Sequence, residues 1–443
     1  MNQSVSKPHR DRLLIQATAW DSGPLSRVDL HHSTRLRPST ISLIVRRLLD
    51  EGKLLEAGRG DNPKGRKQNL LRLNEEFGSI LALEFDDEKI TASIIDLYMQ
   101  IKASITQQTI LDQGMPGLTQ QLLSCAHKAI EQAEIPTRNL IGIGVADPGL
   151  VNTHEGVTVT SSTIEFWRHV SVKQIFEKEF AVPTLVESKT RAKAVAERVL
   201  RAGRIVGDMI YIDYGAGIGA AMILGGRLVH GHRWAAGEVG HIQMIENGPA
   251  CKCGNFGCLE AIAGTAALES RMRKALAEGS GSKALELVGG DTSKLTGWTV
   301  LRASRLGDKT SSAIVEQAVK YLGFGLAILV NLFNPSLVIL DQRLEIAGPD
   351  FLDQIMRIVK QQAIAYSTED LILEFARMPE AGVLGMGLMV LQSYFGVHTL
   401  KPPKFLVESR AKSKQRSGVE QEALPDLTSS NSSTEKPEGL VRT

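Results

Sequence analysis

Residues 237–244, GEVGHIQM, and residues 251–260, CKCGNFGCLE, are the most informative stretch of this sequence. They place one imidazole and three thiols within eighteen residues: His241, Cys251, Cys253 and Cys258. Zinc favours four nitrogen or sulfur ligands in a tetrahedron, and four protein ligands leave no position open for a substrate. The stretch therefore predicts a structural Zn²⁺ site rather than a catalytic one. Three reduced thiols in a surface loop are the alternative.

Cysteine usage and composition indicate where the protein works. Cys125 stands alone, and we expect it to be a small buried side chain, whereas a cluster of three cysteines in a reducing compartment indicates metal binding. The N-terminal MNQSVSKPHRDRLL lacks the apolar core of a signal peptide, and the chain has no run of eighteen apolar residues. With 43% hydrophobic and 23% charged residues, we expect a cytoplasmic protein without a membrane partner.

Outside this stretch, apolar segments of strand length alternate with helical patterns. The expected strands are 80–85, 90–96, 141–145, 182–187, 209–213 and 220–224, and the expected helices are 118–134, 193–201 and 312–331. Such alternation predicts an α/β body with parallel strand pairing. Because 443 residues exceed one compact core, two or three domains are expected.

The N-terminal residues have a different organisation, with short helices and tight turns. Residues 9–20 predict a first helix, and Ser26 and Asp29 have capping-box spacing at the start of a second, which ends near residue 32. A third helix is expected from Pro38, because proline suits the first helical turn. Its apolar residues repeat at helical spacing on one face: Ile41, Ile44, Val45, Leu48 and Leu49.

The opposite face of this third helix carries hydroxyl and guanidinium groups, which fit the phosphates and base edges of a DNA major groove. The residues concerned are Arg37, Ser39, Thr40, Ser42, Arg46 and Arg47. Residues 58–73 follow as two short strands around a basic, Gly-rich loop that contains Lys64 and Arg66. Residues 1–74 hold fourteen Lys and Arg against seven Asp and Glu, whereas the remainder is net negative. This order of short helices, tight turn and basic loop predicts a winged helix-turn-helix that binds double-stranded DNA. The alternative is that the polar face of the third helix is merely solvated.

Several motifs together resemble the signature of the ROK family of repressors and sugar kinases. They are GEVGH with CKCGNFGCLE, GAGIGAAMILGGRLVHG (215–231), IGIGVADPGLV (141–151), YLGFGLAILVNLFNPSLVIL (321–340) and EAGVLGMGLMVL (380–391). The resemblance covers roughly residues 10–398, and the N-terminal part is similar to that of the family's repressor branch. It implies a two-lobed, sugar-kinase-like body of the actin/ribonuclease-H kind, with a sugar cleft between the lobes.

The resemblance also implies domain limits and sugar contacts. The expected units are a winged helix at 1–76, a first lobe at 77–195 to which a closing helix at about 382–398 returns, a second lobe at 196–381, and a disordered tail at 401–443. In family members, residues of GEVGH and CLE hold sugar hydroxyls, and here these are Glu238, His241 and Glu260. The histidine would serve the metal with one ring nitrogen and the sugar with the other, so that the metal fixes the ring.

Four places depart from the pattern of the family's kinases. They are the loop Asp86-Asp87-Glu88 in place of a Gly-Gly-Thr-like phosphate loop, Lys189 in place of the catalytic aspartate, Ala216 in place of a threonine, and Asp341 with Gln342 in place of a Gly-Gly pair. Carboxylates repel a triphosphate, since two like charges about 4 Å apart cost about 4 kcal/mol at an effective dielectric constant near 20. An ammonium group cannot accept the proton of a sugar hydroxyl. We therefore expect no kinase activity.

Substitutions near the expected position of the sugar's terminal hydroxyl indicate that the cleft recognises a different ligand from that of the family's kinases. Ser188 and Lys189, and Thr163 ahead of Trp167, replace side chains that are usual in the family. One hypothesis is that Lys189, with Arg191, binds an anionic substituent such as a phosphate or carboxylate. The alternative is that Lys189 pairs with Glu187 or another acid and that the cleft is vestigial.

Three classes of function follow. The first is a sequence-specific DNA-binding repressor of carbohydrate genes that responds to a sugar or sugar derivative and works as a homodimer or homotetramer. In a dimer, a ligand between the lobes would favour one lobe angle and so set the spacing of the two recognition helices. The second class is an ATP-dependent sugar kinase with a DNA-binding head. The third is a regulator controlled by a protein partner that contacts the tail.

Overall fold

The N-terminal head consists of three helices and a β-ribbon in the order that the sequence predicts. In the computed structural model, which describes residues 6–60, 68–201 and 207–397, these elements are α1 (Lys7–Ser22), α2 (Arg27–Thr34), α3 (Pro38–Asp50), β1 (Leu54–Gly60) and β2 (Gln68–Leu73). Ser26 and Asp29 form the predicted capping box, and β1 pairs antiparallel with β2. The head is therefore a winged helix-turn-helix; the predicted loop residues Lys64 and Arg66 lie outside the described residues.

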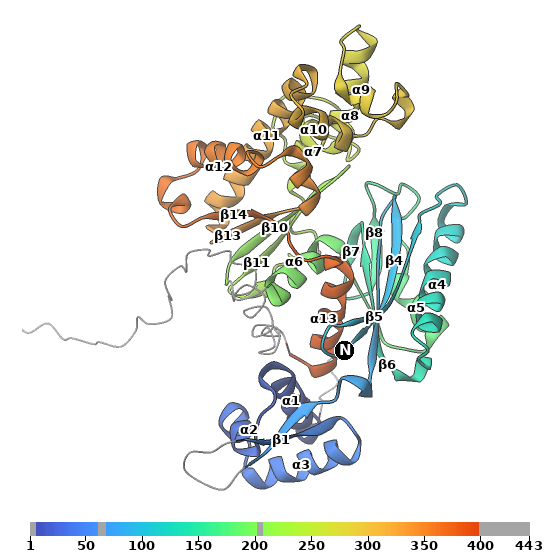
Figure 1. The fold of residues 1–443 in the computed structure, drawn as a ribbon, viewed down its shortest axis with the longest axis vertical. Helices are drawn as coiled ribbons and strands as arrows, with labels where there is room; N and C mark the ends of the chain where they lie inside the picture. Colours follow the sequence, from blue (N-terminus) through green and yellow to red (C-terminus); the bar gives the residue numbers. More distant parts are fainter. Residues whose placement is uncertain (1–5, 61–67, 202–206, 398–443) are drawn as a thin grey trace, which may run out of the picture.

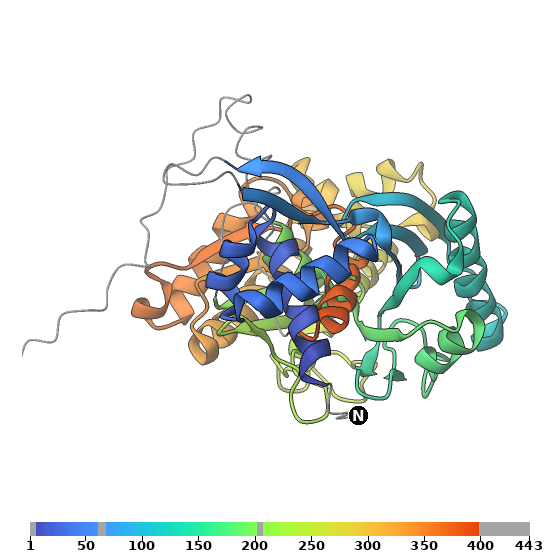
Figure 2. The same cartoon turned by 90° about the horizontal axis from the view of Figure 1, so that it is seen from below.

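One face of α3 is buried in the head, as its periodicity predicts. Ile41, Val45 and Leu48 are fully buried, and Ile44 and Leu49 pack partly against the same core. Seen from below, the blue helices of the head lie in front of the body (Figure 2). The head therefore forms one end of the molecule, and the outer face of α3 is available to a partner.

The first sheet of the body has the strand order β5-β4-β3-β6-β9. Its strands are β3 (Ser79–Phe85), β4 (Lys89–Asp96), β5 (Ile101–Gln108), β6 (Leu140–Asp147) and β9 (Thr184–Ser188). β3, β6 and β9 are parallel, whereas β4 and β5 continue the sheet antiparallel. The sequence does not predict β5, because this half-exposed edge strand is mostly polar. We call this sheet and its covering helices the first lobe.

Alternate residues of β3 face the two layers that cover the first sheet. Leu81 and Leu83 face one core with α4 (Gly114–Gln132) and α5 (Val172–Phe180), whereas Ile80 and Ala82 face another with α13 (Ala381–Phe395). A small hairpin, β7 (Leu150–Asn152) and β8 (Val157–Thr160), follows β6. The pattern explains why β3 is apolar throughout: both of its faces are buried.

The second sheet has the order β12-β11-β10-β13-β14. Its strands are β10 (Met209–Tyr214), β11 (Ile218–Leu224), β12 (Arg227–Leu228), β13 (Leu337–Leu340) and β14 (Ile372–Phe375). Ile210 and Ile212 face a helical layer, whereas Met209 and Tyr211 face α6 (Lys189–Leu200). The helical layer contains α7 (Leu259–Ala263), α8 (Thr265–Ala277), α9 (Lys283–Leu287), α10 (Gly297–Arg305), α11 (Lys309–Phe333) and α12 (Phe351–Gln362). We call this unit the second lobe.

α11 is long and apolar enough, by length and composition, to cross a membrane. More than half of its apolar window is buried, and the helix packs against α8, α10 and α12. It is therefore the central core helix of the second lobe.

Two helices, α6 and α13, lie between the sheets (Figure 1). They approach closely because position 385 is glycine: a Cβ there would lie 1.8 Å from the carbonyl oxygen of Ala192. α13 also packs on β3 and β6 and contacts α1 of the head. Trp20 of α1 donates from Nε1 to the carbonyl of Leu97, so the head, the first lobe and α13 share one hydrophobic core. The predicted boundary between the lobes at 195/196 falls within α6, and the domain limits stay predictions.

Candidate functional site

A cluster of one histidine and three cysteines lies in the second lobe. His241 ends a 3-10 turn (Val239–His241), Cys258 precedes α7, and Cys251 and Cys253 belong to the loop between them. One ligand atom from each residue lies within 4.8 Å of the others, with 3.7 Å between the Sγ atoms of Cys253 and Cys258. Zn–S bonds of about 2.3 Å in a tetrahedron place sulfur atoms roughly 3.8 Å apart. The four predicted residues therefore fit a tetrahedral metal ion.

The loop closes around this cluster at two glycines with positive φ. Gly254 has φ +93° and Gly257 has φ +68°, a region that favours glycine. A Cβ at position 257 would lie 1.8 Å from the carbonyl oxygen of Ile245. Burial, together with the neighbouring thiols, raises the pKa of Cys258 to about 12. A cation is thus needed to hold all three sulfurs as thiolates.

His241 connects the metal cluster to the predicted sugar contacts. Its Nδ1 lies 3.6 Å from Cys251 Sγ, and its Nε2 lies 3.8 Å from Glu238 Oε2. Glu260 of α7 is buried, and its Oε2 accepts a hydrogen bond from the backbone N–H of Ile218 at 3.2 Å. Burial raises the pKa of both carboxyl groups. The structure brings Glu238, His241 and Glu260 together. Nδ1 of His241 faces the cysteines of the cluster, and Nε2 faces Glu238.

Arg191 ties the first lobe to the loop that precedes these residues. Its Nε donates to Glu187 Oε1 at 2.7 Å, and its Nη1 donates to the carbonyl of Trp234 at 3.1 Å. Glu187 is fully buried, and its other oxygen lies 2.9 Å from His230 Nε2. The guanidinium group of Arg191, which could have bound an anionic ligand, is thus bound to Glu187 and to the carbonyl of Trp234. Ser188, another predicted ligand residue, lies at the start of α6, half-buried beside Glu187.

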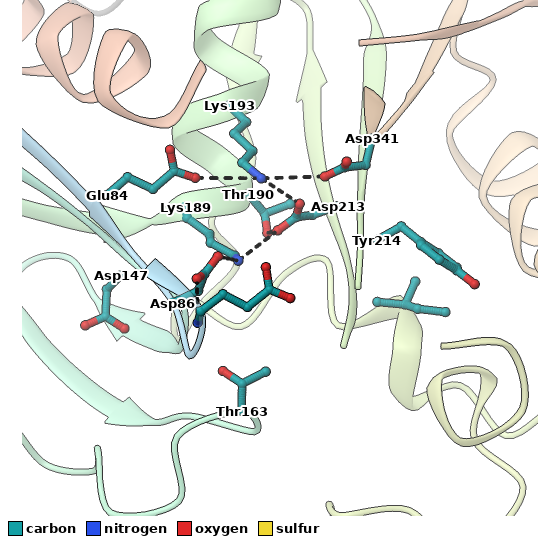
Figure 3. A network of polar contacts seen from close by, with 12 residues as sticks. Glu84, Asp86, Asp147, Thr163, Lys189, Thr190, Lys193, Asp213, Tyr214 and Asp341 are labelled. Carbon is teal, nitrogen blue, oxygen red and sulfur yellow. Dashed lines mark hydrogen bonds and ion pairs between the residues drawn. The ribbon is translucent and has the colours of Figure 1, made fainter. Parts of the chain in front are cut away.

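Lys189 of α6 forms an ion pair with Asp86, which follows β3 of the first sheet (Figure 3). Its Nζ lies 3.2 Å from Asp86 Oδ2 and 3.9 Å from Asp213 Oδ2, and its side chain is 15% exposed. Although burial opposes ionisation, the charge of Lys189 helps to hold the pKa of Asp86 below its usual value. Asp86 Oδ1 accepts from the backbone N–H groups of Glu88 and Lys89, which fixes the loop. The structure thus favours the alternative in which Lys189 pairs with an acid, and that acid is Asp86 rather than Glu187.

Lys193, one helical turn later, continues the network (Figure 3). Its Nζ lies 2.9 Å from Asp213 Oδ1 and 3.6 Å from Asp341 Oδ2. A third carboxylate, Glu84 of β3, lies 3.7 Å away. Burial opposes both charges, but the ion pairs raise the pKa of Lys193 well above its usual value and hold that of Asp213 well below. We call six residues the interlobe ion cluster: Glu84 and Asp86 of the first lobe, Lys189 and Lys193 of α6, and Asp213 and Asp341 of the second lobe.

Sequence reasoning missed Lys193, Asp213 and Glu84 as members of a site. One signal was present, since Lys189 and Lys193 have the i, i+4 spacing that places two side chains on one helix face. The carboxylates had no such signal. They come from strands far apart in the chain, and only the packing of both sheets against α6 brings them together.

The outer face of α3 carries the predicted DNA-binding residues. Arg37 is the N-cap residue, Ser39, Ser42, Arg46 and Arg47 are exposed, and Thr40 is half-buried. Within the described part of the chain, the three guanidinium groups of this set form no ion pair. Two further residues were not predicted. Arg27 of α2 lines a shallow pocket with Ser42 and Arg46, and Leu43 is 53% exposed in the middle of the polar face.

Replacing Lys193 with methionine tests the interlobe ion cluster, because it removes the ammonium group but keeps the length of the side chain. Breaking a buried ion pair costs about 3–5 kcal/mol, so we expect a lower melting temperature at pH 7.5. Asp213 keeps its contribution in the wild type at pH 4.5, because that contribution is lost only as pH falls from the ordinary pKa of aspartate through the much lower pKa of the folded state. The unpaired carboxylates of the variant instead take up protons as pH falls and so lose their penalty. The difference should therefore shrink towards pH 4.5.

The matched control is Lys274→Met, which removes an exposed lysine of α8. It should leave the melting temperature unchanged at both pH values. Equal melting temperatures for the wild type and Lys193→Met at pH 7.5 would contradict the role given to this cluster.

Comparisons with known proteins agree with this architecture. A model described as ROK family matches residues 80–393. The chain is 26% identical over 382 residues to the xylose repressor of Caldicellulosiruptor bescii, a match that covers 86% of this chain and 95% of that protein. It is 28% identical over 347 residues to the DNA-binding transcriptional dual regulator NagC of Escherichia coli K12, covering 77% and 82%.

A solved structure extends the similarity to the head. The crystal structure of a ROK family transcriptional regulator, a homologue of the E. coli MLC protein, superimposes with a TM-score of 0.75 at 24% identity. The match covers 88% of this chain and 97% of that one, so the two share the complete fold. The relatives matched over most of their length are named as a xylose repressor and as a DNA-binding transcriptional dual regulator. The family match over residues 80–393, more than half of the chain, shows that the chain belongs to the ROK family.

Proposed function

We propose that this protein is a cytoplasmic, sequence-specific DNA-binding repressor of carbohydrate genes whose cleft binds a sugar effector and has no kinase activity. The observation that carries the DNA-binding part is the outer face of α3, where hydroxyl and guanidinium groups are exposed and the guanidinium groups are not neutralised by described acids. Phosphates attract such cations, and base edges in the major groove accept hydrogen bonds from them. The relatives named as repressors support the same conclusion.

Contacts between helices of the body and the head suggest a route by which a bound sugar would control DNA binding. A ligand held by Glu238, His241 and Glu260 would bias the position of the second lobe relative to α6. α6 packs on α13, and α13 packs on α1 of the head. Because the head shares its core with the first lobe, a change in lobe angle would act on operator binding through the relative placement of two heads in a homodimer or homotetramer.

Two substitutions in α3 separate phosphate binding from sequence reading. Arg47→Ala should weaken binding to an operator selected from random duplexes and reduce the slope of log affinity against log salt by about 1, because one phosphate contact is lost. Leu43→Ala should leave that slope unchanged but relax the preference for thymine at one position per half-site, since the thymine methyl is the apolar group of the major groove edge. Fluorescence anisotropy at several salt concentrations measures both effects.

The control for these variants is Arg302→Ala, which removes an exposed arginine of α10 in the body. It should bind DNA like the wild type. Failure of the selection to enrich any sequence would overturn the DNA-binding part of the proposal.

The absence of kinase activity is supported by the interlobe ion cluster. Kinase chemistry needs a base near the sugar hydroxyl and cations that offset phosphate charge. Here Lys189 is a cation in the position expected for the base, and both lysines of the cluster are already paired with carboxylates. Two further carboxylates, Asp87 and Glu88, are exposed on the loop expected to approach phosphate.

A coupled assay for ADP release tests this part directly. With Mg²⁺, ATP and a panel of pentoses and hexoses, we expect no turnover above the rate without protein. Sugar-dependent ADP release by the purified wild type, absent from the Lys189→Met variant, would contradict the proposal and favour the kinase alternative.

We also propose that the ion held by the His–Cys₃ cluster is a structural Zn²⁺. The support is the tetrahedral spacing of the ligand atoms and their sulfur-rich chemistry.

Protein purified without chelator should contain about one zinc per chain by elemental analysis. Cys258→Ser should lose most of the zinc and melt at a lower temperature, because metal binding contributes to folding. Cys125→Ala, which changes the cysteine outside the cluster, should keep its zinc; retention of zinc by Cys258→Ser would contradict the assignment.

A further inference from the structure

Four cations between the two sheets are each paired with a carboxylate. Lys189 pairs with Asp86, Lys193 with Asp213, Arg191 with Glu187, and Arg343 with Asp341, where Nε lies 3.1 Å from Oδ1. Burial disfavours these charges, but Asp341 and the other nearby carboxylates raise the pKa of Arg343. Each of these four cations has a carboxylate partner. Among the described residues, Nη2 of Arg191 is buried without a hydrogen-bond partner, and Lys252, near Glu260, bonds to the carbonyl of Ser162 rather than to an acid.

Carboxylates also outnumber cations there. The interlobe ion cluster has four carboxylates against two ammonium groups, and Arg343 reduces the excess only to one negative charge. Glu238 and Glu260 add two carboxyl groups at the predicted sugar contacts. A phosphate brought into this region would meet like charge in a partly buried setting, where repulsion is stronger than in water.

Lys189 is connected to the sugar contacts by the start of β11. A Cβ at Gly217 would lie 3.1 Å from Glu260 Oε2, and a Cβ at Gly219 would lie 3.3 Å from Thr190 Oγ1. Thr190 follows Lys189 and donates to Asp213 Oδ2 at 3.3 Å. The ammonium group that an anionic ligand would need thus lies at the same end of the cleft as Glu260.

We propose that the cleft takes an uncharged sugar and excludes sugar phosphates, because Asp86 occupies the ammonium group of Lys189. This inference rests on the proposed sugar-binding function and adds the chemical class of the effector. Glu238 and Glu260 present oxygen acceptors, and sugar hydroxyls supply donors to them. Asp86 is then a specificity-determining residue, since its charge decides whether Lys189 is free for a phosphate.

Asp86→Asn isolates this charge. The asparagine Oδ1 can still accept from the N–H groups of Glu88 and Lys89, so the loop keeps its hydrogen bonds. Lys189 would retain only the more distant Asp213 at 3.9 Å. Asp112→Asn is the matched control, because it removes an exposed carboxylate of the first lobe that lies outside both the ion cluster and the loop of Asp86.

Isothermal titration calorimetry of the full-length protein with inorganic phosphate, D-glucose 6-phosphate, D-glucose, D-xylose and N-acetyl-D-glucosamine tests the proposal. We expect the wild type to bind a neutral sugar but neither phosphate compound, and Asp86→Asn to bind phosphate or glucose 6-phosphate about tenfold or more tightly than the wild type. Asp112→Asn should behave like the wild type.

Phosphate binding by the wild type that matches Asp86→Asn, or no gain in that variant, would overturn the role of Asp86. Binding of glucose 6-phosphate in preference to every neutral sugar would overturn the ligand class. If no sugar binds at all, the sugar-binding part of the proposed function fails and this inference fails with it. The operator selection described above reports separately on the DNA-binding part.

Discussion

Lys193 lies among carboxylates that come from both lobes, and this arrangement constrains everything the cleft can do. Its nearest partner, Asp213, belongs to the second sheet, whereas Glu84 belongs to the first. Glu84 also contacts the start of α13, where a Cβ at Gly382 would lie 2.2 Å from Glu84 Oε2. One set of ion pairs therefore connects α6 to both sheets.

The second constraint is hydrophobic. The core of the head continues into α13 and the first lobe, so the DNA-binding domain is packed onto the body rather than attached by a free linker. The absence of a side chain at Gly385 lets α13 lie directly against the backbone of α6. Under the proposed function, a change in lobe angle would reach the head through these packed helices. His241 belongs both to the His–Cys₃ cluster and to the predicted sugar contacts, because its two ring nitrogens lie near Cys251 and Glu238.

Sequence patterns succeeded where a feature is local. The four residues that could hold a metal ion occur within eighteen residues. The capping box spans four residues, and the apolar face of α3 repeats within three turns. Each of these groups could therefore be predicted without the fold. The family match confirmed the resemblance that the motifs indicated. The polar edge strand β5 could not be identified, because its inward-facing residues are few.

The electrostatics of the cleft required the structure. Lys189 is an unusual residue at its position, but its partner Asp86 lies 103 residues earlier in the chain. Sequence reasoning could list the alternatives of ligand binding and internal pairing but could not choose between them. For the same reason Lys193 and Asp213 were overlooked, and so was Leu43, whose exposure depends on which side of α3 the head covers.

The central claim is that a sugar in the cleft controls operator binding without nucleotide chemistry. Fluorescence anisotropy of a labelled operator duplex, titrated with the protein in the presence and absence of a neutral sugar and of Mg²⁺ with ATP, tests it most directly. The account predicts that sugar alone changes operator affinity by about fivefold or more, a typical allosteric coupling, and that adding Mg²⁺ and ATP changes nothing further. A response that requires ATP, or an operator affinity that no sugar alters, would contradict it.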